Sequence, residues 1–177
     1  RDSLETGYTD NIEVMHCVLY PDPEYPIPIF GADIVATPTV VTAAIADISP
    51  VYKTDKIYKK LGKLANKYEF KEKRPLPEWA DIFSPYCQFM RLRDEEEKSS
   101  YGCMIEEFID FYVDIVKKAK KDNDWVNTML RFDDQIYYCK QQRKNKKTKA
   151  VLSKWFSPEC AEGYINDILF DIPPIPK

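Results

Sequence analysis

Hydrophobic and polar positions alternate along the first fifty residues in a way that predicts β-strands. In residues 12–18 and 29–35, every second side chain shares one face by the two-residue period of a strand. Residues 39–48 form a further apolar run, β-branched at its start and ended by a Ser-Pro pair. The turn GYTDN, which contains Asp10, predicts a strand pair over residues 1–19. Because no long helical pattern separates these runs, they indicate an antiparallel sheet rather than βαβ units.

Beyond these strands, the hydrophobic period changes to that of amphipathic helices. Residues 55–70 place apolar side chains at helical spacing, with lysines around the rest of the helix. A polar, proline-broken loop over residues 71–79 leads to an apolar run that is typical of a strand at 88–92. Three more helices are predicted: a stripe from Ile105 to Val116, a segment over residues 124–140, and a helix opened by Ser157 and Pro158. Strands followed by helices predict an α+β fold in which helices cover the faces of a sheet.

Composition fits one soluble globular domain over residues 1–177. Hydrophobic residues make up 44% of the chain and charged residues 31%, and neither a repeat nor a low-complexity linker divides it. A net charge of −3 does not point to nucleic acid, and we expect no nucleic-acid partner. The sequence has no apolar run of membrane-spanning length, so we expect no membrane association.

Cysteines and glycines exclude several kinds of site. The five cysteines are odd in number and lack CxxC spacing, which argues against a disulfide framework or a zinc site and indicates a reducing compartment. None of the five glycines belongs to a GxGxxG motif or a P-loop, which nucleotide folds use to bring backbone amides to phosphates. A redox enzyme built from this chain therefore has to receive its electrons from outside.

Two ionisable residues stand within the strand patterns. His16 is the only histidine of the chain, and Asp33 lies between apolar neighbours in the run 29–35. If the two strands are neighbours, both side chains project from one sheet face and can exchange protons near neutral pH. A structural histidine and a strand-end salt bridge are the alternatives, and on spacing alone they are the commoner outcome.

Five sequence blocks in fixed order resemble the ferredoxin-dependent bilin reductases. They are HCVLYP, PIFGADIV, AAIADISPV, LPEWADIFS and YYCKQQRKNKKTK, and the resemblance covers residues 4–171. It is strongest to the branch of the family that makes phycocyanobilin. The resemblance implies an α/β/α sandwich with a central antiparallel β-sheet flanked by helices, and a chain that lacks the family's N-terminal portion.

The resemblance also implies an activity: four-electron reduction of biliverdin IXα to phycocyanobilin through bilin radical intermediates. External reduced ferredoxin supplies the electrons, and the protein binds neither a metal nor a flavin. Another bilin product, such as phycoerythrobilin or a two-electron product, and a non-catalytic bilin-binding protein are the alternatives. The family further implies a monomer in the cytoplasm of a cyanobacterium, in a phage-infected cell, or in the plastid stroma of an alga.

Site residues follow from the family's motifs. His16 and Asp33 match the pair that exchanges protons with the bilin, and their separation is that of the family. Glu5 matches an acid beside the D-ring vinyl group, although the turn between Glu5 and His16 is one residue shorter here. Arg74 matches a residue that binds a propionate group, and a guanidinium can hold a carboxylate through two hydrogen bonds.

The basic run over residues 140–149 is the densest positive segment of the chain. On composition alone it is a solvated helix end. The resemblance places Lys147 and Asn145 at the bilin pocket, with Lys146 in the position of a family acid. Because ferredoxins are acidic, we expect a docking surface formed by Lys140, Arg143, Lys144 and Lys146, with a second basic segment over residues 53–67.

Overall fold

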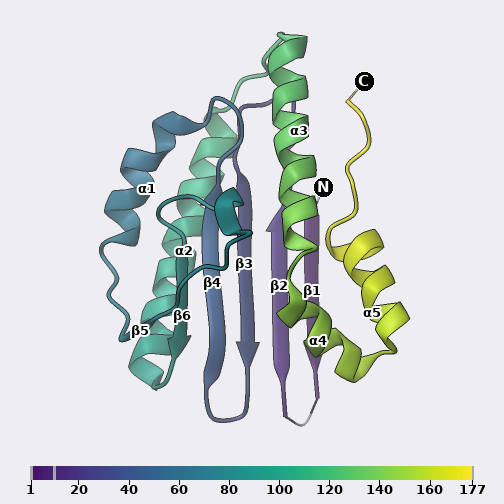
Figure 1. Cartoon of the computed structure of the whole chain (residues 1–177). Coiled ribbons are helices and arrows are strands. Elements are labelled where there is room, and N and C mark those ends of the chain that lie inside the picture. The colour runs from purple at the N-terminus through teal and green to yellow at the C-terminus, as the bar shows by residue number, and fades with distance from the viewer. Residues whose placement is uncertain (1, 10, 177) are drawn as a thin grey trace.

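A six-stranded antiparallel sheet forms the middle layer of the molecule (Figure 1). The structure is a computed structural model that describes residues 2–9 and 11–176. The strands are β1 (Asp2–Tyr8), β2 (Glu13–Leu19), β3 (Ile29–Ala36), β4 (Val41–Ser49), β5 (Glu72–Lys73) and β6 (Gln88–Leu92). Their spatial order is β1-β2-β3-β4-β6-β5, with every neighbouring pair antiparallel, which confirms the predicted sheet. Asp10, expected in the turn between β1 and β2, lies outside the described residues.

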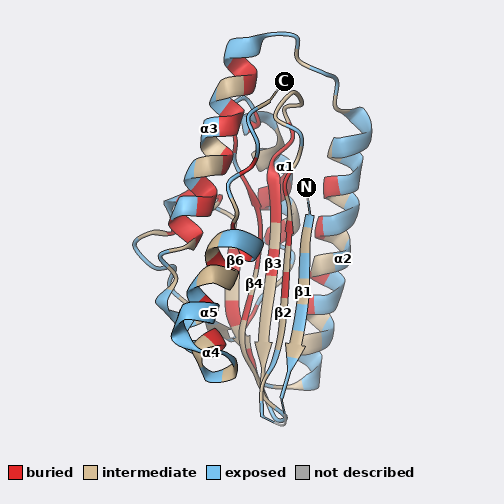
Figure 2. Ribbon diagram, turned by 90° about the vertical axis from the view of Figure 1, so that its right-hand side faces the viewer, coloured by how far each residue is buried: buried red, intermediate tan, exposed pale blue. Residues whose placement is uncertain are grey.

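Helices cover both faces of the sheet, as predicted (Figure 2). One face carries α1 (Tyr58–Ala65), which follows a 3₁₀ turn (Asp55–Ile57), and α2 (Glu95–Lys118). The other face carries α3 (Trp125–Gln142), α4 (Lys146–Trp155), α5 (Pro158–Tyr164), the π-helical turn η3 (Ile165–Leu169) and the 3₁₀ turn η2 (Ala80–Ile82). None of the helices in the described part of the chain is both long and apolar enough to span a membrane.

Alternate side chains of the central strands pack into two separate hydrophobic cores, one on each face of the sheet. Toward α1 and α2, apolar side chains such as Phe30 and Ile48 pack with Met104 and Phe108 of α2. Full burial of side chains of this size stabilises the fold by about 1.5–3 kcal/mol each. The opposite face carries a second cluster, formed by Val18, Tyr20, Ile29, Val51, Ile82, Tyr138, Cys139, Leu152, Ala161, Ile165, Leu169 and Phe170. That second cluster holds α3, α4 and α5 against the sheet.

Two helix starts differ from the sequence prediction, and both are fixed by side-chain caps. Helix α2 begins at Glu95, because Asp94 accepts a hydrogen bond from the Glu97 amide at 2.9 Å. Helix α4 was not predicted, since its lysine-rich sequence resembles a solvated helix end. It begins after Asn145, whose side chain accepts hydrogen bonds from two amides of the first turn. The two-residue strand β5 was also missed, within a segment predicted as a loop.

Two helical glycines give a matched test of packing against propensity. A Cβ atom at Gly62 of α1 would lie 2.5 Å from Cε1 of Tyr86, whereas one at Gly102 of α2 would meet nothing within 4 Å. We expect Gly102→Ala to stabilise the protein by about 0.5–1 kcal/mol through helix propensity. Gly62→Ala should instead destabilise it by about 1–3 kcal/mol through overpacking. Denaturant unfolding of both variants checks this, and a stabilising Gly62→Ala would show that Tyr86 moves aside freely.

Candidate active site

Three acid–base side chains form one row across three adjacent strands. The strand register pairs Glu5 of β1 with His16 of β2, and His16 with Asp33 of β3. Residues directly opposite each other in an antiparallel pair project from the same face. This face is the one covered by α3, α4 and α5. The structure therefore brings together the three residues predicted to be catalytic.

His16 and Asp33 form an ion pair at the centre of this row. Nδ1 of His16 donates to Oδ1 of Asp33 across 2.6 Å. The His16 side chain is 9% exposed and that of Asp33 is 35% exposed, so Asp33 is less desolvated than its apolar sequence neighbours suggested. Burial lowers the pKa of His16, but the charge of Asp33, the hydrogen bond to it and the charge of Glu5 together raise it above the usual 6.5. His16 is therefore held as a cation to a higher pH than a free histidine.

The second nitrogen of His16 faces away from Asp33. Nε2 is buried and has no hydrogen-bond partner among the described residues. A buried polar atom without a partner costs about 1–3 kcal/mol, and such atoms often mark functional sites. The Phe170 ring lies edge-on to the imidazole, with centroids 5.3 Å apart and planes at 83°. His16 is thus paired on one side and covered by an aromatic ring on another.

Glu5 is held by the C-terminal part of the chain. The Tyr164 hydroxyl of α5 donates to Oε2 of Glu5 across 2.8 Å. Burial, the hydrogen bond to Glu5 and the charge of Glu5 raise the pKa of Tyr164 to about 12, so the phenol keeps its proton at neutral pH. Further along the same face of β1, Trp155 of α4 lies against Gly7, where a Cβ atom would be 2.6 Å from the indole ring. A glycine is required at this position for α4 to approach the strand.

At the other end, the row continues through apolar residues to Arg74. The register pairs Asp33 with Ile45 and Ile45 with Phe89. The Arg74 guanidinium lies over the Phe89 ring at 5.1 Å, and its Nη1 donates to the Thr42 carbonyl across 2.9 Å. The structure therefore places the predicted propionate-binding arginine on the face that carries the row, on the β6 side.

The predicted pocket residues of the basic run lie at the start of α4. Oδ1 of Asn145 accepts hydrogen bonds from the amides of Lys147 at 3.1 Å and Thr148 at 3.3 Å. The Lys147 side chain is exposed. Asn145 therefore has a capping role, and the structure records no contact of either residue with the acid–base row.

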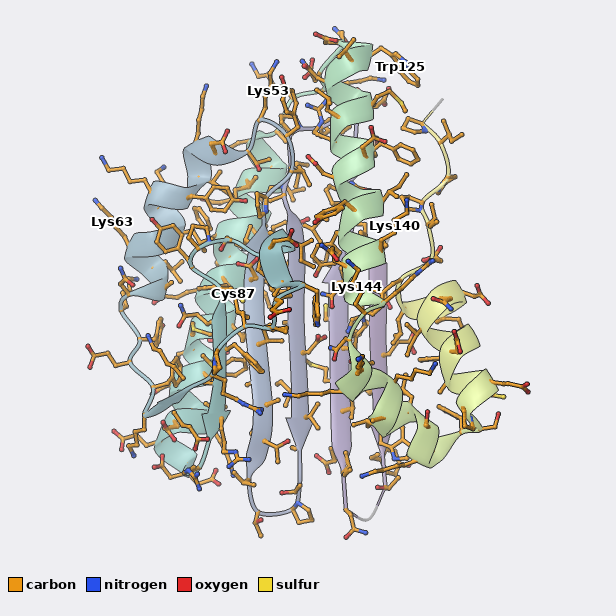
Figure 3. All side chains as sticks on the ribbon, viewed as in Figure 1. Lys53, Lys63, Cys87, Trp125, Lys140 and Lys144 are labelled. Atoms are coloured by element: carbon orange, nitrogen blue, oxygen red, sulfur yellow. The ribbon has the colours of Figure 1, made fainter. Side chains whose placement is uncertain are left out.

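The four expected docking residues fall into two groups. Lys140, Lys144 and Lys146 are exposed; Figure 3 shows Lys140 and Lys144 at the C-terminal end of α3, and Lys63 projecting from α1 at the opposite edge. Arg143 is half-buried, and its Nη2 donates to the carbonyls of Asn166 at 2.9 Å and Phe170 at 2.7 Å. Its guanidinium is engaged with η3, whereas the three lysines face solvent.

A fully buried carboxyl group on this face escaped the sequence analysis. Asp47 of β4 is 1% exposed and accepts hydrogen bonds from the Ser49 hydroxyl at 2.6 Å, the Ser84 amide at 2.8 Å and the Ser84 hydroxyl. Burial raises the pKa of Asp47, and these hydrogen bonds oppose that rise only in part. The group ties the loop after η2 to the sheet. Its one sequence signal was an acid between apolar residues in a strand, the same signal that singled out Asp33.

Other kinds of site find less support in the structure. One cavity of about 360 Å³ lies between the β1–β2 and β3–β4 turns, and one of about 350 Å³ lies over the adjoining ends of β1, β2 and β3. Neither is lined by a residue of the acid–base row. Residues 2–9 and 11–176 contain no cluster of three or more histidine, cysteine or acidic side chains that could hold a metal ion. Among the described residues, the acid–base row is therefore the candidate site with the clearest chemistry.

Comparison with known proteins assigns the family. The profile described as "Ferredoxin-dependent bilin reductase" matches residues 5–171. The chain belongs to this family. It is 41% identical over 165 residues to a protein named phycocyanobilin:ferredoxin oxidoreductase from Prochlorococcus marinus (strain MIT 9303), and 38% identical over 170 residues to one of the same name from Synechococcus sp. (strain CC9902).

The matches cover this bilin reductase chain more fully than they cover its relatives. The alignment to the Prochlorococcus protein takes in 92% of this chain but 62% of that protein, and the alignment to the Synechococcus protein takes in 94% and 69%. The crystal structure of phytochromobilin synthase from tomato in complex with biliverdin superposes with a TM-score of 0.84 at 20% identity, covering 94% of this chain and 64% of that one. This likeness confirms the sandwich fold.

The ion pair leads to a prediction about pH that NMR can test. Because His16 is the only histidine of the chain, its imidazole resonance can be followed without overlap from another histidine. In the wild type we expect the pKa of His16 to lie above 6.5. In Asp33→Asn it should lie below 6.5, because the charge of Glu5 alone does not offset the effect of burial. A raised pKa in the folded state makes the stability from His16 complete below pH 6.5 and lost as pH rises through the folded pKa. The free energy of unfolding should therefore fall with pH across this window in the wild type but not in Asp33→Asn.

The control for this titration is Glu13→Gln, which removes an exposed acid from the same strand. It should leave the His16 titration where it is in the wild type. An equal shift in both variants would mean that overall charge, and not the Asp33 contact, sets the pKa.

Proposed function

We propose that this protein reduces biliverdin IXα to phycocyanobilin, taking four electrons from reduced ferredoxin and supplying protons from its own side chains. The observation that carries the proposal is the Glu5–His16–Asp33 row, found on one sheet face in a chain of the bilin reductase family. Each pair of electrons added to the bilin requires two protons. A redox step of this kind needs acids held beside the substrate, and the row supplies them.

The ion pair suits the first protonation steps. Asp33 is the more exposed member of the pair and can donate a proton to a bilin that lies over the sheet face. His16 then returns a proton to Asp33 through the 2.6 Å contact. The unpartnered Nε2 of His16 is the natural donor to a lactam oxygen of the bilin. In this proposal, the Phe170 ring moves aside to let the bilin reach His16.

The ends of the row set the orientation of the substrate. Glu5, at one end, protonates the D-ring vinyl group, whose saturation separates phycocyanobilin from two-electron products. Arg74, at the other end, binds a propionate group, and Lys147 and Asn145 reach the bilin only if the start of α4 turns toward the sheet. Lys146 stands where the resemblance places a family acid, and this departure is the observation behind a second candidate, a bilin reductase with a different product.

Electrons arrive from a separate protein. The exposed Lys140, Lys144 and Lys146 lie beside the helices that cover the row, so a negatively charged ferredoxin docked on them would be close to the bilin. We propose a single reductase domain that acts as a monomer. The relatives from Prochlorococcus and Synechococcus support a cyanobacterial cytoplasm as its location.

Anaerobic incubation with biliverdin and a ferredoxin-reducing system tests the activity. The wild type should convert biliverdin to phycocyanobilin, identified by chromatography. Asp33→Asn should bind biliverdin with similar affinity, because the amide keeps the size of the side chain, but should lose at least about a hundredfold in turnover and accumulate a bound radical or unreduced bilin. Absorption and electron paramagnetic resonance spectra follow the two species.

Three outcomes of this experiment separate the alternatives. A different bilin from the wild type would identify a reductase with another product. Binding without reduction would identify a non-catalytic bilin-binding protein. Turnover by Asp33→Asn at the wild-type rate would remove Asp33 from the mechanism.

Charge removal tests the docking surface. Replacing Lys140, Lys144 and Lys146 together with glutamine should raise the KM for ferredoxin several-fold at low ionic strength and leave kcat nearly unchanged. The difference in KM between this variant and the wild type should shrink at high salt, because salt screens the attraction between ferredoxin and the lysines that the variant lacks. The matched control replaces Lys56, Lys59 and Lys60, which precede or belong to α1, with glutamine. If only this control raises the KM, ferredoxin docks at the α1 edge.

A further inference from the structure

We infer that Tyr164 is a positioning residue for Glu5 and that the π-helical turn η3, held by Arg143, sets its place. This inference rests on the proposed function, in which Glu5 protonates the D-ring vinyl group. In this inference, Tyr164 takes no part in electron transfer and does not contact the bilin. Its hydroxyl acts on the reaction through the orientation of the Glu5 carboxylate.

The first observation is the contact between the two ends of the chain. The Tyr164 hydroxyl donates to Oε2 of Glu5 across 2.8 Å, joining residues separated by 159 positions. Glu5 lies on β1, a strand at the edge of the sheet, so only one neighbouring strand holds it. A carboxylate on an edge strand has several rotamers open to it, and one charge-assisted hydrogen bond is enough to select among them.

The second observation is the unusual backbone that follows Tyr164. Residues 165–169 form a π-helical turn, a rare conformation that is frequent at functional sites. Tyr164 before the turn contacts Glu5, and Phe170 after the turn lies against His16. One short segment therefore covers two adjacent members of the row, and the π turn gives the spacing that lets both aromatic rings face the sheet.

Arg143 holds this segment in place. Its Nε donates to the Phe170 carbonyl at 3.1 Å, and its Nη2 donates to the carbonyls of Phe170 at 2.7 Å and Asn166 at 2.9 Å. Asn166 lies within the π turn and Phe170 directly follows it, in a segment too short to supply helical donors to all of its carbonyls. A planar guanidinium presents its donors in a rigid fork that fits both carbonyls, whereas the compact ammonium of lysine, on a flexible stem, does not reproduce this geometry. Arg143 thus ties the end of α3 to the segment that carries Tyr164 and Phe170.

The test compares Tyr164→Phe with Tyr137→Phe. The control also loses a tyrosine hydroxyl that donates to a carboxylate, but its acceptor is Oδ2 of Asp81 on η2, at 2.6 Å, and not a member of the row. Tyr164→Phe should bind biliverdin normally and carry out the early reduction, yet slow reduction of the D-ring vinyl group roughly ten- to a hundredfold, so that a vinyl-retaining bilin accumulates. Tyr137→Phe should give the wild-type product. An unchanged product from Tyr164→Phe would overturn the inference.

A double-mutant cycle tests whether Tyr164 acts through Glu5. Glu5→Gln alone should yield mainly a product with the vinyl group intact, and the residual rate of vinyl reduction in this variant is the reference for the cycle. Adding Tyr164→Phe to Glu5→Gln should then lower this residual rate no further, because the carboxyl group that the hydroxyl orients is already absent. Equal losses in the presence and absence of Glu5 would assign Tyr164 a general structural role.

An infrared measurement keeps the inference independent of the proposed function. The carboxylate bands of Glu5 are identified as those that disappear in Glu5→Gln. They should shift in Tyr164→Phe and stay fixed in Tyr137→Phe, whether or not the protein reduces biliverdin. A wild type without activity but with this shift would reject the proposed function alone, whereas fixed bands would reject the inference alone.

Arg143→Lys tests the support of η3. It should retain charge but release the carbonyls of Asn166 and Phe170, and so shift the product toward the vinyl-retaining bilin by an amount that salt does not change. A change confined to the KM for ferredoxin that disappears at high salt would show that Arg143 serves docking instead.

Discussion

The register between β1, β2 and β3 is the constraint on which the candidate site depends. Glu5, His16 and Asp33 face one another only because each is directly opposite the next across an antiparallel pair. A slip of one residue at either pair would turn a member of the row to the α1–α2 face, since side chains alternate with a period of two. Burial of Val18 on one face and Phe30 on the other resists such a slip. The geometry of the row is thus a by-product of sorting apolar side chains between two cores.

The two faces of the sheet are built differently. The core under α1 and α2 is formed by apolar and aromatic side chains, and it gives the sheet a rigid support. The opposite face interleaves its apolar cluster with polar groups: His16, Asp33, Asp47 and the serines that bond to Asp47. Buried polar groups whose hydrogen bonds are all formed specify one packing arrangement, because losing a hydrogen-bond partner inside the protein costs free energy of folding. The buried Asp47 group therefore fixes the position of the loop after η2 on the same face that carries the row.

Much of this arrangement could be predicted from local patterns. The strand period of β2 and β3 indicated the shared face of His16 and Asp33, and the sequence order of strands and helices indicated the layers. Family motifs supplied Glu5 and Arg74, which structure places on the same face. Local patterns failed for side chains that bond to a residue distant in the sequence, because such a side chain has the same local pattern as one that is exposed to solvent. Arg143 was grouped with the exposed lysines, because its contact with the Phe170 carbonyl spans the helices α4 and α5 and the π turn η3.

Helix α4 and Tyr164 escaped prediction for related reasons. The charge of the basic run concealed the cap that Asn145 provides to a new helix. Tyr164 lay on a predicted helix, yet its partner is at the other end of the chain and no periodicity reports such a pairing. Contacts of this kind become visible only once the sheet and its covering helices are assembled.

The position of β1 at the rim of the sheet gives the row a gradient of stability. His16 and Asp33 lie on strands with neighbours on both sides, whereas Glu5 lies on a strand bonded along one side only. Edge strands open more readily than central ones, and they do so without unfolding the rest of a domain. Amide protons of β1 should accordingly exchange with solvent well before those of β2 and β3. Conditions too mild to disturb the ion pair could detach the acid at the rim, so an enzyme of this design would lose its last reductive step before its first.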